Sequence, residues 1–196
     1  MGKDIMRSLL LILTLLSLAG CQTPVTPESA ASIDLSKNGI VVVSVRKKGD
    51  PEDVKKVTVE FYLRGQTPGA SSPFVNSSKE LWVLAVPPGN YAISDWYMVV
   101  GQEKRASSEH KYVFSVKAGG ITYIGCLESE VGREKDLFGL KWVPKALPHV
   151  RDMSQEDIAA FRLAYPAWSG LAVDTQVTDG FEWKDAQTSR GKIPGI

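Results

Sequence analysis

Ser44 and Lys47 have the types and the spacing of a nucleophile and its base, because they match the S-x-x-K motif of penicillin-binding enzymes. In that motif, one helical turn brings the lysine amine to the serine hydroxyl. Here the pair lies at the end of a β-branched run at residues 40–45, and residues three apart in a strand point to opposite faces. The companion S-D-N and K-T-G motifs are absent from the sequence. We therefore predict that Ser44 and Lys47 form no catalytic pair.

His110 and His149 are the only histidines that could bind a metal or act as a general base. Neither has a cysteine, a histidine or a carboxylate at metal-ligand spacing. We predict that both are surface residues, and we predict no metal site and no cofactor. An enzyme would need a site assembled from dispersed residues such as Asp95, His110 and Glu128, and such an envelope enzyme is the alternative function.

Basic residues surround the connection between two predicted strands, at residues 46–48, 55 and 56. They could contact anionic lipid headgroups or a cell-wall polymer. Acidic residues at positions 50, 52 and 53 offset this charge. The pattern favours a solvated hairpin tip over a binding site.

The N-terminal segment has the organisation of a signal peptide. Lys3 and Arg7 are followed by an apolar run at residues 8–18, which is about half the length of a membrane-spanning helix. Leu18-Ala19-Gly20-Cys21 closes this segment, and we predict that residues 1–20 are the signal peptide.

These four residues resemble the lipobox of bacterial lipoproteins. The resemblance implies cleavage between Gly20 and Cys21, a diacylglycerol on the Cys21 thiol and a further acyl chain such as palmitate on the freed amine. The domain would then face the periplasm or the cell exterior. Gln22 replaces the aspartate that retains such proteins in the inner membrane, which favours attachment to the outer membrane.

Charge composition argues against nucleic-acid binding. The full sequence has 23 basic and 22 acidic residues, and residues 21–196 have 21 of each. A nucleic-acid surface normally carries a clear basic excess. We expect the membrane, through the N-terminal lipid, and an unknown envelope protein as partners.

Cys126 has no second cysteine available if Cys21 carries lipid. Strand periodicity places Ile124, Cys126 and Glu128 on one face of a strand at residues 121–127 and its continuation. Because unpaired cysteine is among the residues most often buried, we predict a structural and slowly reacting thiol.

Period-two patterns and turn residues predict a mainly β domain at residues 39–145. We expect an antiparallel β-sandwich of about seven strands, with one hairpin after residues 40–45 and another across Pro88-Gly89. Residues 21–38 have the composition of a flexible tether. Residues 146–196 form a predicted C-terminal extension with a helix near 154–164 and a frayed tail.

Two segments of this β region resemble known domains. Residues 80–93 resemble a strand–turn–strand element of carboxypeptidase-regulatory-like and transthyretin-like sandwich domains, and residues 114–125 resemble a strand pair of bacterial lipoproteins with such folds. The resemblance implies a fold and a binding or structural role without chemistry of its own.

Four aromatic residues in the last third could face a partner, since aromatic side chains often anchor interfaces. They are Phe138, Trp142, Tyr165 and Trp168. Packing over an open sheet edge is the favoured alternative. Taken together, the sequence predicts a lipid-anchored envelope protein that serves as a non-enzymatic structural or binding module.

Overall fold

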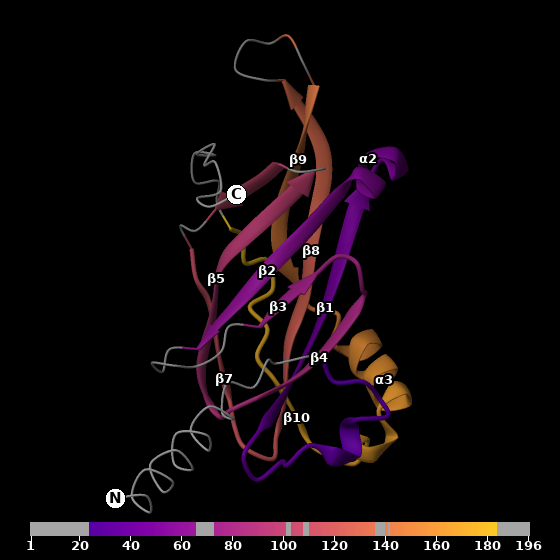
Figure 1. Cartoon of the computed structure of the whole chain (residues 1–196), viewed down its shortest axis with the longest axis vertical. Helices are drawn as coiled ribbons and strands as arrows, with labels where there is room; N and C mark the ends of the chain where they lie inside the picture. The colour runs from indigo at the N-terminus through magenta and orange to yellow at the C-terminus, as the bar shows by residue number, and fades with distance from the viewer. Residues whose placement is uncertain are drawn as a thin grey trace, which may run out of the picture.

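The computed structural model describes residues 24–65, 73–100, 103–107, 110–135, 140 and 142–183. Ten strands in these ranges form two sheets of five strands each (Figure 1). The first sheet contains β1 (Gly39–Gly49), β4 (Leu81–Val86), β8 (Ile121–Lys135), β9 (Trp142–Arg151) and β10 (Val173–Thr175). The second contains β2 (Val57–Gly65), β3 (Phe74–Asn76), β5 (Gly89–Val100), β6 (Glu103–Ser107) and β7 (Tyr112–Val116).

The sequence correctly predicted a mainly β protein, but the strand number and the strand orientation differ from the prediction. There are ten strands rather than about seven. The first sheet is mixed, because β1 and β10 both pair with β8 in parallel, whereas β4 and β9 pair antiparallel with their neighbours. Parallel pairs need crossover connections, which local strand patterns do not reveal.

The two predicted hairpins are wrong because these connections cross from one sheet to the other. A short helix, α2 (Pro51–Lys56), links β1 of the first sheet to β2 of the second. Pro88-Gly89 joins β4 of the first sheet to β5 of the second. The Tyr91 hydroxyl donates a 2.8 Å hydrogen bond to the Pro87 carbonyl and so closes this crossing.

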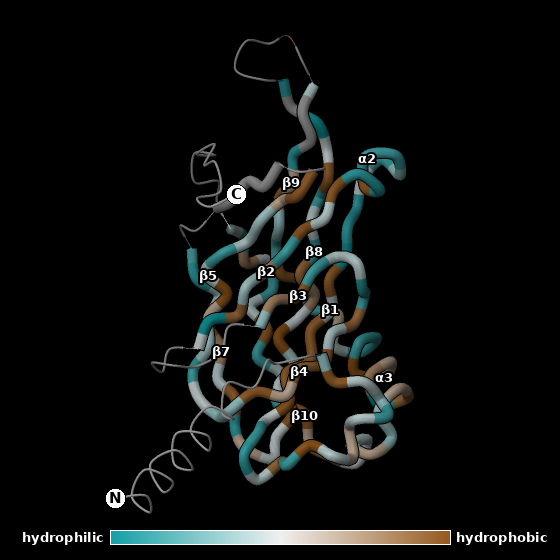
Figure 2. The backbone as a smooth tube through the Cα atoms, in the orientation of Figure 1, coloured by the Kyte–Doolittle hydropathy of each residue, from teal (hydrophilic) through white to brown (hydrophobic). Residues whose placement is uncertain are grey.

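The main hydrophobic core lies between the two sheets. Alternate residues of β1 (Val41, Val43 and Val45) face residues of β2 and β5 such as Phe61 and Ile93, and all five are almost completely buried. Figure 2 shows hydrophobic positions concentrated along the central strands, whereas α2 is mostly hydrophilic. This alternation is the period-two pattern that the sequence displays.

A β-bulge at Gly125 reverses the expected facing of part of β8. The register between β1 and β8 shifts between Val42 and Ser44, so that two residues of β8 oppose Val43. Ile124 therefore faces the main core, while Cys126 lies on the outer face. The prediction that Ile124 and Cys126 share a face is wrong for this reason.

A second hydrophobic cluster covers the outer face of the first sheet. Its cover consists of α3 (Ser154–Ala164), the 3-10 turn η3 (Pro166–Trp168) and the segment that contains η2 (Ala30–Ser32). The rings of Phe161 and Tyr165 stack with centroids 5.3 Å apart, and those of Tyr165 and Trp168 with centroids 5.8 Å apart. The helix predicted near 154–164 is confirmed.

Residues 24–38 pack against this cluster, although the sequence predicted a flexible tether there. Val25 is 3% exposed, and its N–H donates a 2.8 Å hydrogen bond to the Val83 carbonyl. The Tyr165 hydroxyl donates a 2.7 Å bond to the Val25 carbonyl. Residues 1–23, which include the predicted signal peptide, Cys21 and the rest of the predicted tether, lie outside the described residues.

The predicted C-terminal extension is part of the same fold up to Trp183. β9 continues to Arg151, so the expected boundary at residue 145 falls inside a strand. Trp183 is buried, and its indole N–H donates to the Ile93 carbonyl at 3.3 Å. Residues 184–196, the predicted frayed tail, lie outside the described residues. No helix in the described ranges is long and apolar enough to cross a membrane.

Candidate functional site

Polar side chains form a stripe along the outer face of the first sheet, next to α3. Strand register places Ser44 beside Cys126 and Arg46 beside Glu128, and it places Arg151 beside Cys126 on the other edge of β8. We define the polar stripe as Ser44, Arg46, Lys48, Cys126, Glu128, His149 and Arg151. Three strands thus bring a hydroxyl, a thiol, a carboxylate and several cations to one surface.

Asp157 of α3 is the centre of the buried end of this stripe, and it is 3% exposed. Its Oδ2 accepts hydrogen bonds from the Ser44 hydroxyl and, at 2.6 Å, from the Tyr123 hydroxyl. Its Oδ1 accepts from the Arg46 guanidinium at 3.0 Å. A buried carboxylate with three donors is compensated, so this arrangement is stable without a ligand.

Arg46 connects the buried network to the surface. Its Nε lies 3.4 Å from Glu80 Oε1 and its Nη1 lies 3.6 Å from Glu156 Oε2. Burial alone would lower the pKa of Arg46, but Asp157 and the other acidic groups raise it above its ordinary value. The guanidinium therefore remains a fixed positive charge at the rim of the stripe.

Cys126 is completely buried, as the sequence predicted. Burial raises the pKa of its thiol to about 11, and the nearby charges of Asp157 and Glu128 act in the same direction. Ser44 and Arg46 favour the thiolate and oppose this rise. Near neutral pH the thiol is protonated, and a protonated thiol is a poor nucleophile.

Glu128 is the centre of the other half of the stripe and is 4% exposed. It pairs with Lys48 at 2.9 Å, with His149 Nε2 at 3.1 Å and with an Arg151 guanidinium nitrogen at 3.6 Å. Burial would raise its pKa, but Lys48 and His149 lower it below its ordinary value. His149 was predicted as a solvated surface histidine, but its side chain is only 17% exposed and lies against Glu128.

Asp95 and Glu128, two of the three dispersed residues considered for an enzyme, do not meet. Asp95 pairs with Arg64 on the outer face of the second sheet, whereas Glu128 lies on the outer face of the first. His110 precedes β7, and among the described residues no group bonds its buried Nδ1. The structure thus separates Asp95 from Glu128 by the main core.

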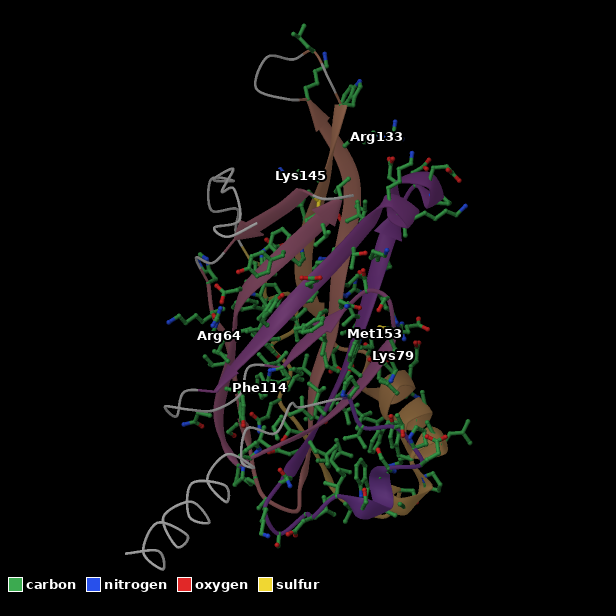
Figure 3. The ribbon with its side chains drawn as sticks, in the orientation of Figure 1. Arg64, Lys79, Phe114, Arg133, Lys145 and Met153 are labelled. Carbon is green, nitrogen blue, oxygen red and sulfur yellow. The ribbon has the colours of Figure 1, made fainter. Side chains whose placement is uncertain are left out.

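The predicted basic hairpin tip is instead a structural corner. Lys47 points inward, and its amine donates to the carbonyls of Val54 at 2.8 Å and Val57 at 2.6 Å. Burial lowers the pKa of Lys47. Asp53 accepts hydrogen bonds from Arg133 Nε at 2.7 Å and from Arg133 Nη2 at 2.6 Å, and Figure 3 shows Arg133 beside α2. Lys47 and Asp53 therefore stabilise the corner.

A groove of about 520 Å³ opens at the exposed end of the polar stripe. It lies beside the part of β1 that extends past the N-terminal end of β4, because the pairing of the two strands stops at Ser44 and Leu81. Met153, labelled in Figure 3, lies at its rim just before α3. We call this the edge groove, and its walls are Val45, Arg46, Lys47, Lys48, Val54, Ser77, Ser78, Glu80, Glu128, Arg151 and Met153.

The edge groove exposes a strand edge that no described strand covers. The Val45 N–H still donates to the Glu80 carbonyl at 2.8 Å, which is the last such bond on this side of β1. Alternate residues of a strand direct their main-chain N–H and C=O groups to the same side. The main-chain groups of Lys47 therefore point to the same side as those of Val45, but they lie past the N-terminal end of β4. The groove therefore combines main-chain hydrogen-bonding groups with charged side chains of both signs.

The four candidate partner-facing aromatics have different positions. Tyr165 and Trp168 are buried in the second cluster, so they pack over the first sheet and do not face a partner. Trp142 is 63% exposed, and the Lys135 amine lies 5.6 Å from its ring centroid. Phe138 lies outside the described residues.

Sequence reasoning missed the central residue of the site. Asp157 is an acidic residue in the first turn of the predicted helix, a position at which acidic residues commonly do no more than favour the helix start. It precedes Phe161 by four residues and so lies on the buried face of α3. A carboxylate on an apolar helix face was the available signal. In the part of the chain that the structure describes, no group of three or more histidine, cysteine or acidic residues could hold a metal ion.

Comparison with known proteins gives little further information. No family of known proteins matches the chain, and a search of curated proteins found no match. Among solved structures, a leucine-rich repeat protein from Bacteroides thetaiotaomicron is 12% identical, with a TM-score of 0.30. The match covers 49% of this chain and 14% of that protein. A similarity of this size carries no argument about fold or function.

Proposed function

We propose that this protein is a lipid-anchored protein of the bacterial cell envelope that serves as a non-enzymatic structural or binding module. The anchor is supported by Leu18, Ala19 and Gly20, which precede Cys21 in the register of a lipobox. On this proposal acylated Cys21 is the first residue of the mature chain, and Gln22 directs it to the outer membrane.

The observation that supports a non-enzymatic role is the use of the reactive groups within the polar stripe. Ser44 is 1% exposed and Cys126 is fully buried, beneath the helix that carries Asp157. The Ser44 hydroxyl donates to Asp157, and the raised pKa of Cys126 favours the thiol. A substrate would have to displace α3 to reach either group, whereas catalytic groups normally line an accessible pocket.

We also propose that the two sheets are the layers of a β-sandwich of the transthyretin-like kind. This is supported by their shared core, to which Val43 of the first sheet and Phe61 of the second contribute. An exposed sheet edge can accept an added strand, so the uncovered edge of β1 is the binding surface that we assign here.

The edge groove is the binding site that we assign to this module, and an extended peptide segment is the ligand class that fits it. A strand added in line with β4 would bond the main chain of Lys47, as in β-strand addition. Lys48 and Glu80 are exposed and oppositely charged, so they could pair with charged side chains of the added strand. An extended segment of another envelope protein meets these requirements.

The anchor is tested by Cys21→Ser. The parent protein should remain with the membrane fraction and its mature form should carry an acyl adduct by intact mass, while the variant should be soluble or unprocessed. Membrane partitioning that is the same in both proteins, with no adduct on the parent, would show that the anchor is wrong.

The binding site is tested by a photo-crosslinking amino acid at Ser78, an exposed residue of the groove rim. The matched control is Asn90, which is exposed at the start of β5 in the other sheet. We expect a discrete protein adduct in intact envelopes from position 78 and none from position 90. A peptide with the sequence of the crosslinked segment should then compete with the purified partner for crosslinking at position 78. Equal labelling at both positions would contradict the assignment.

A further inference from the structure

The chain is fixed to the folded domain very soon after the predicted lipid-bearing residue. Val25 is buried, and it is held on one side by Val83 and on the other by Tyr165. Only residues 22–24 stand between Cys21 and Val25. The following argument rests on the proposed lipid attachment at Cys21.

Chain length limits how far the domain can lie from its anchor. An extended chain spans at most about 3.6 Å per residue, so the Cα atoms of Cys21 and Val25 are no more than about 14 Å apart. A tether that continued to residue 38 would reach about 60 Å by the same arithmetic. Packing of residues 24–38 removes that reach and leaves the Val25 end of the domain close to the lipid headgroups.

An exposed apolar side chain lies near the end of the helix that leads to Tyr165, whose hydroxyl bonds the Val25 carbonyl. Leu163, in the last turn of α3, is 86% exposed and faces the solvent side of the helix. Arg162 beside it is also exposed. An apolar side chain next to a cation suits the headgroup region of a bilayer, where the first is partly buried and the second meets anionic lipid.

We propose that the surface formed by the C-terminal end of α3 and the segment at Val25 rests on the bilayer that holds the Cys21 lipid. We call it the anchor-side surface. The occupant is a lipid bilayer because the short link to Cys21 brings this surface to the membrane. Leu163 contacts the headgroup region, and the lipid anchor orients the domain as well as retaining it.

The orientation also determines what the protein presents to its surroundings. The paired strands β8 and β9 extend beyond the rest of the fold at the end of the long axis opposite η2 (Figure 1). This hairpin, with exposed Trp142, lies at the far end of the long axis from α3.

The test uses the full lipidated protein with an environment-sensitive fluorophore at Leu163→Cys or, as a matched control, at Lys135→Cys of β8. Both positions are exposed, Cys126 is buried and Cys21 is blocked by its lipid. The proteins are placed in vesicles of phosphatidylethanolamine and phosphatidylglycerol that contain a headgroup-labelled quenching lipid. We expect loss of most of the fluorescence at position 163 and almost none at position 135.

A third protein separates orientation from attachment. A flexible insertion of about twenty Gly and Ser residues between Thr23 and Pro24, with a root-mean-square span of about 25 Å, should restore fluorescence at position 163 while the protein stays on the vesicles. Equal quenching at both positions, or at neither, in protein that carries the lipid and binds vesicles would overturn the orientation and leave the anchor standing. Protein without an acyl adduct would overturn both proposals.

Discussion

Tyr123 of β8 and Asp157 of α3 are 34 residues apart in the chain, and the Tyr123 hydroxyl donates a 2.6 Å hydrogen bond to the Asp157 carboxylate. Burial and this carboxylate raise the pKa of Tyr123 far above its ordinary value, so the hydroxyl remains a donor. The bond joins α3 to the outer face of the first sheet. Asp157 is thus the polar attachment point of a helix that is otherwise held by apolar packing in the second cluster.

Asp157→Ala should lower the free energy of unfolding by about 3 kcal/mol, because it leaves buried donors on Ser44 and Tyr123 unpaired and removes the buried partner of Arg46. Urea unfolding followed by circular dichroism measures this change. The matched control is Glu156→Ala, since Glu156 is exposed and lies 3.6 Å from the same guanidinium. That variant should lose less than about 1 kcal/mol. Equal losses would contradict a special role for Asp157.

Gly125→Ala should lower the free energy of unfolding by about 3 kcal/mol, because residue 125 has a positive φ of 95° and little space for a side chain. A Cβ atom there would lie 2.8 Å from Val150 Cγ1 and 3.2 Å from the Arg151 carbonyl oxygen. Gly132→Ala is the control in the same strand, because no atom lies within 4 Å of its added Cβ. We expect the control to stay within about 0.5 kcal/mol of the parent in the same urea measurement. A tolerated Gly125→Ala would argue against the bulge.

Cys126 should react with a thiol reagent only after denaturant is added, since it is fully buried and its pKa is raised to about 11. The same shift predicts a pH effect. Above the ordinary thiol pKa of 9.0 the unfolded chain releases a proton that the folded protein keeps, so rising pH favours unfolding. Between pH 9 and 10 the parent should lose about 1 kcal/mol more than Cys126→Ala does. Buried tyrosines such as Tyr112 and Tyr123, whose pKa values are also raised, contribute equally to the slope in both proteins. Rapid labelling of the native protein would instead indicate a reactive thiol.

Removal of residues up to 38 should destabilise the domain, because Val25 and Ala30 cover Val83 and Tyr165 in the second cluster. A protein that begins at Gly39 should melt several degrees below one that begins at Pro24, as a loss of about 2 kcal/mol implies. Differential scanning calorimetry compares the two. Equal melting temperatures would restore the interpretation of residues 24–38 as a tether.

The sequence by itself determined the elements that depend on local periodicity. Alternating residues such as Val57, Val59 and Phe61 predicted β2, and the acidic first turn before Ile158 predicted α3. Burial of Cys126 followed from residue type. These features depend on a few neighbouring residues, so one sequence is enough to reveal them.

Only the tertiary structure decided which strands pair and which polar groups meet. The crossing at Pro88-Gly89 has the residues of a hairpin turn, but β4 and β5 belong to different sheets. The bulge at Gly125 changes which later side chains of β8 face outward, and so places Cys126 on the same outer face as Tyr123, close to Asp157. Pairing partners and long-range contacts depend on how the whole chain buries its apolar faces, and a local pattern does not contain that information.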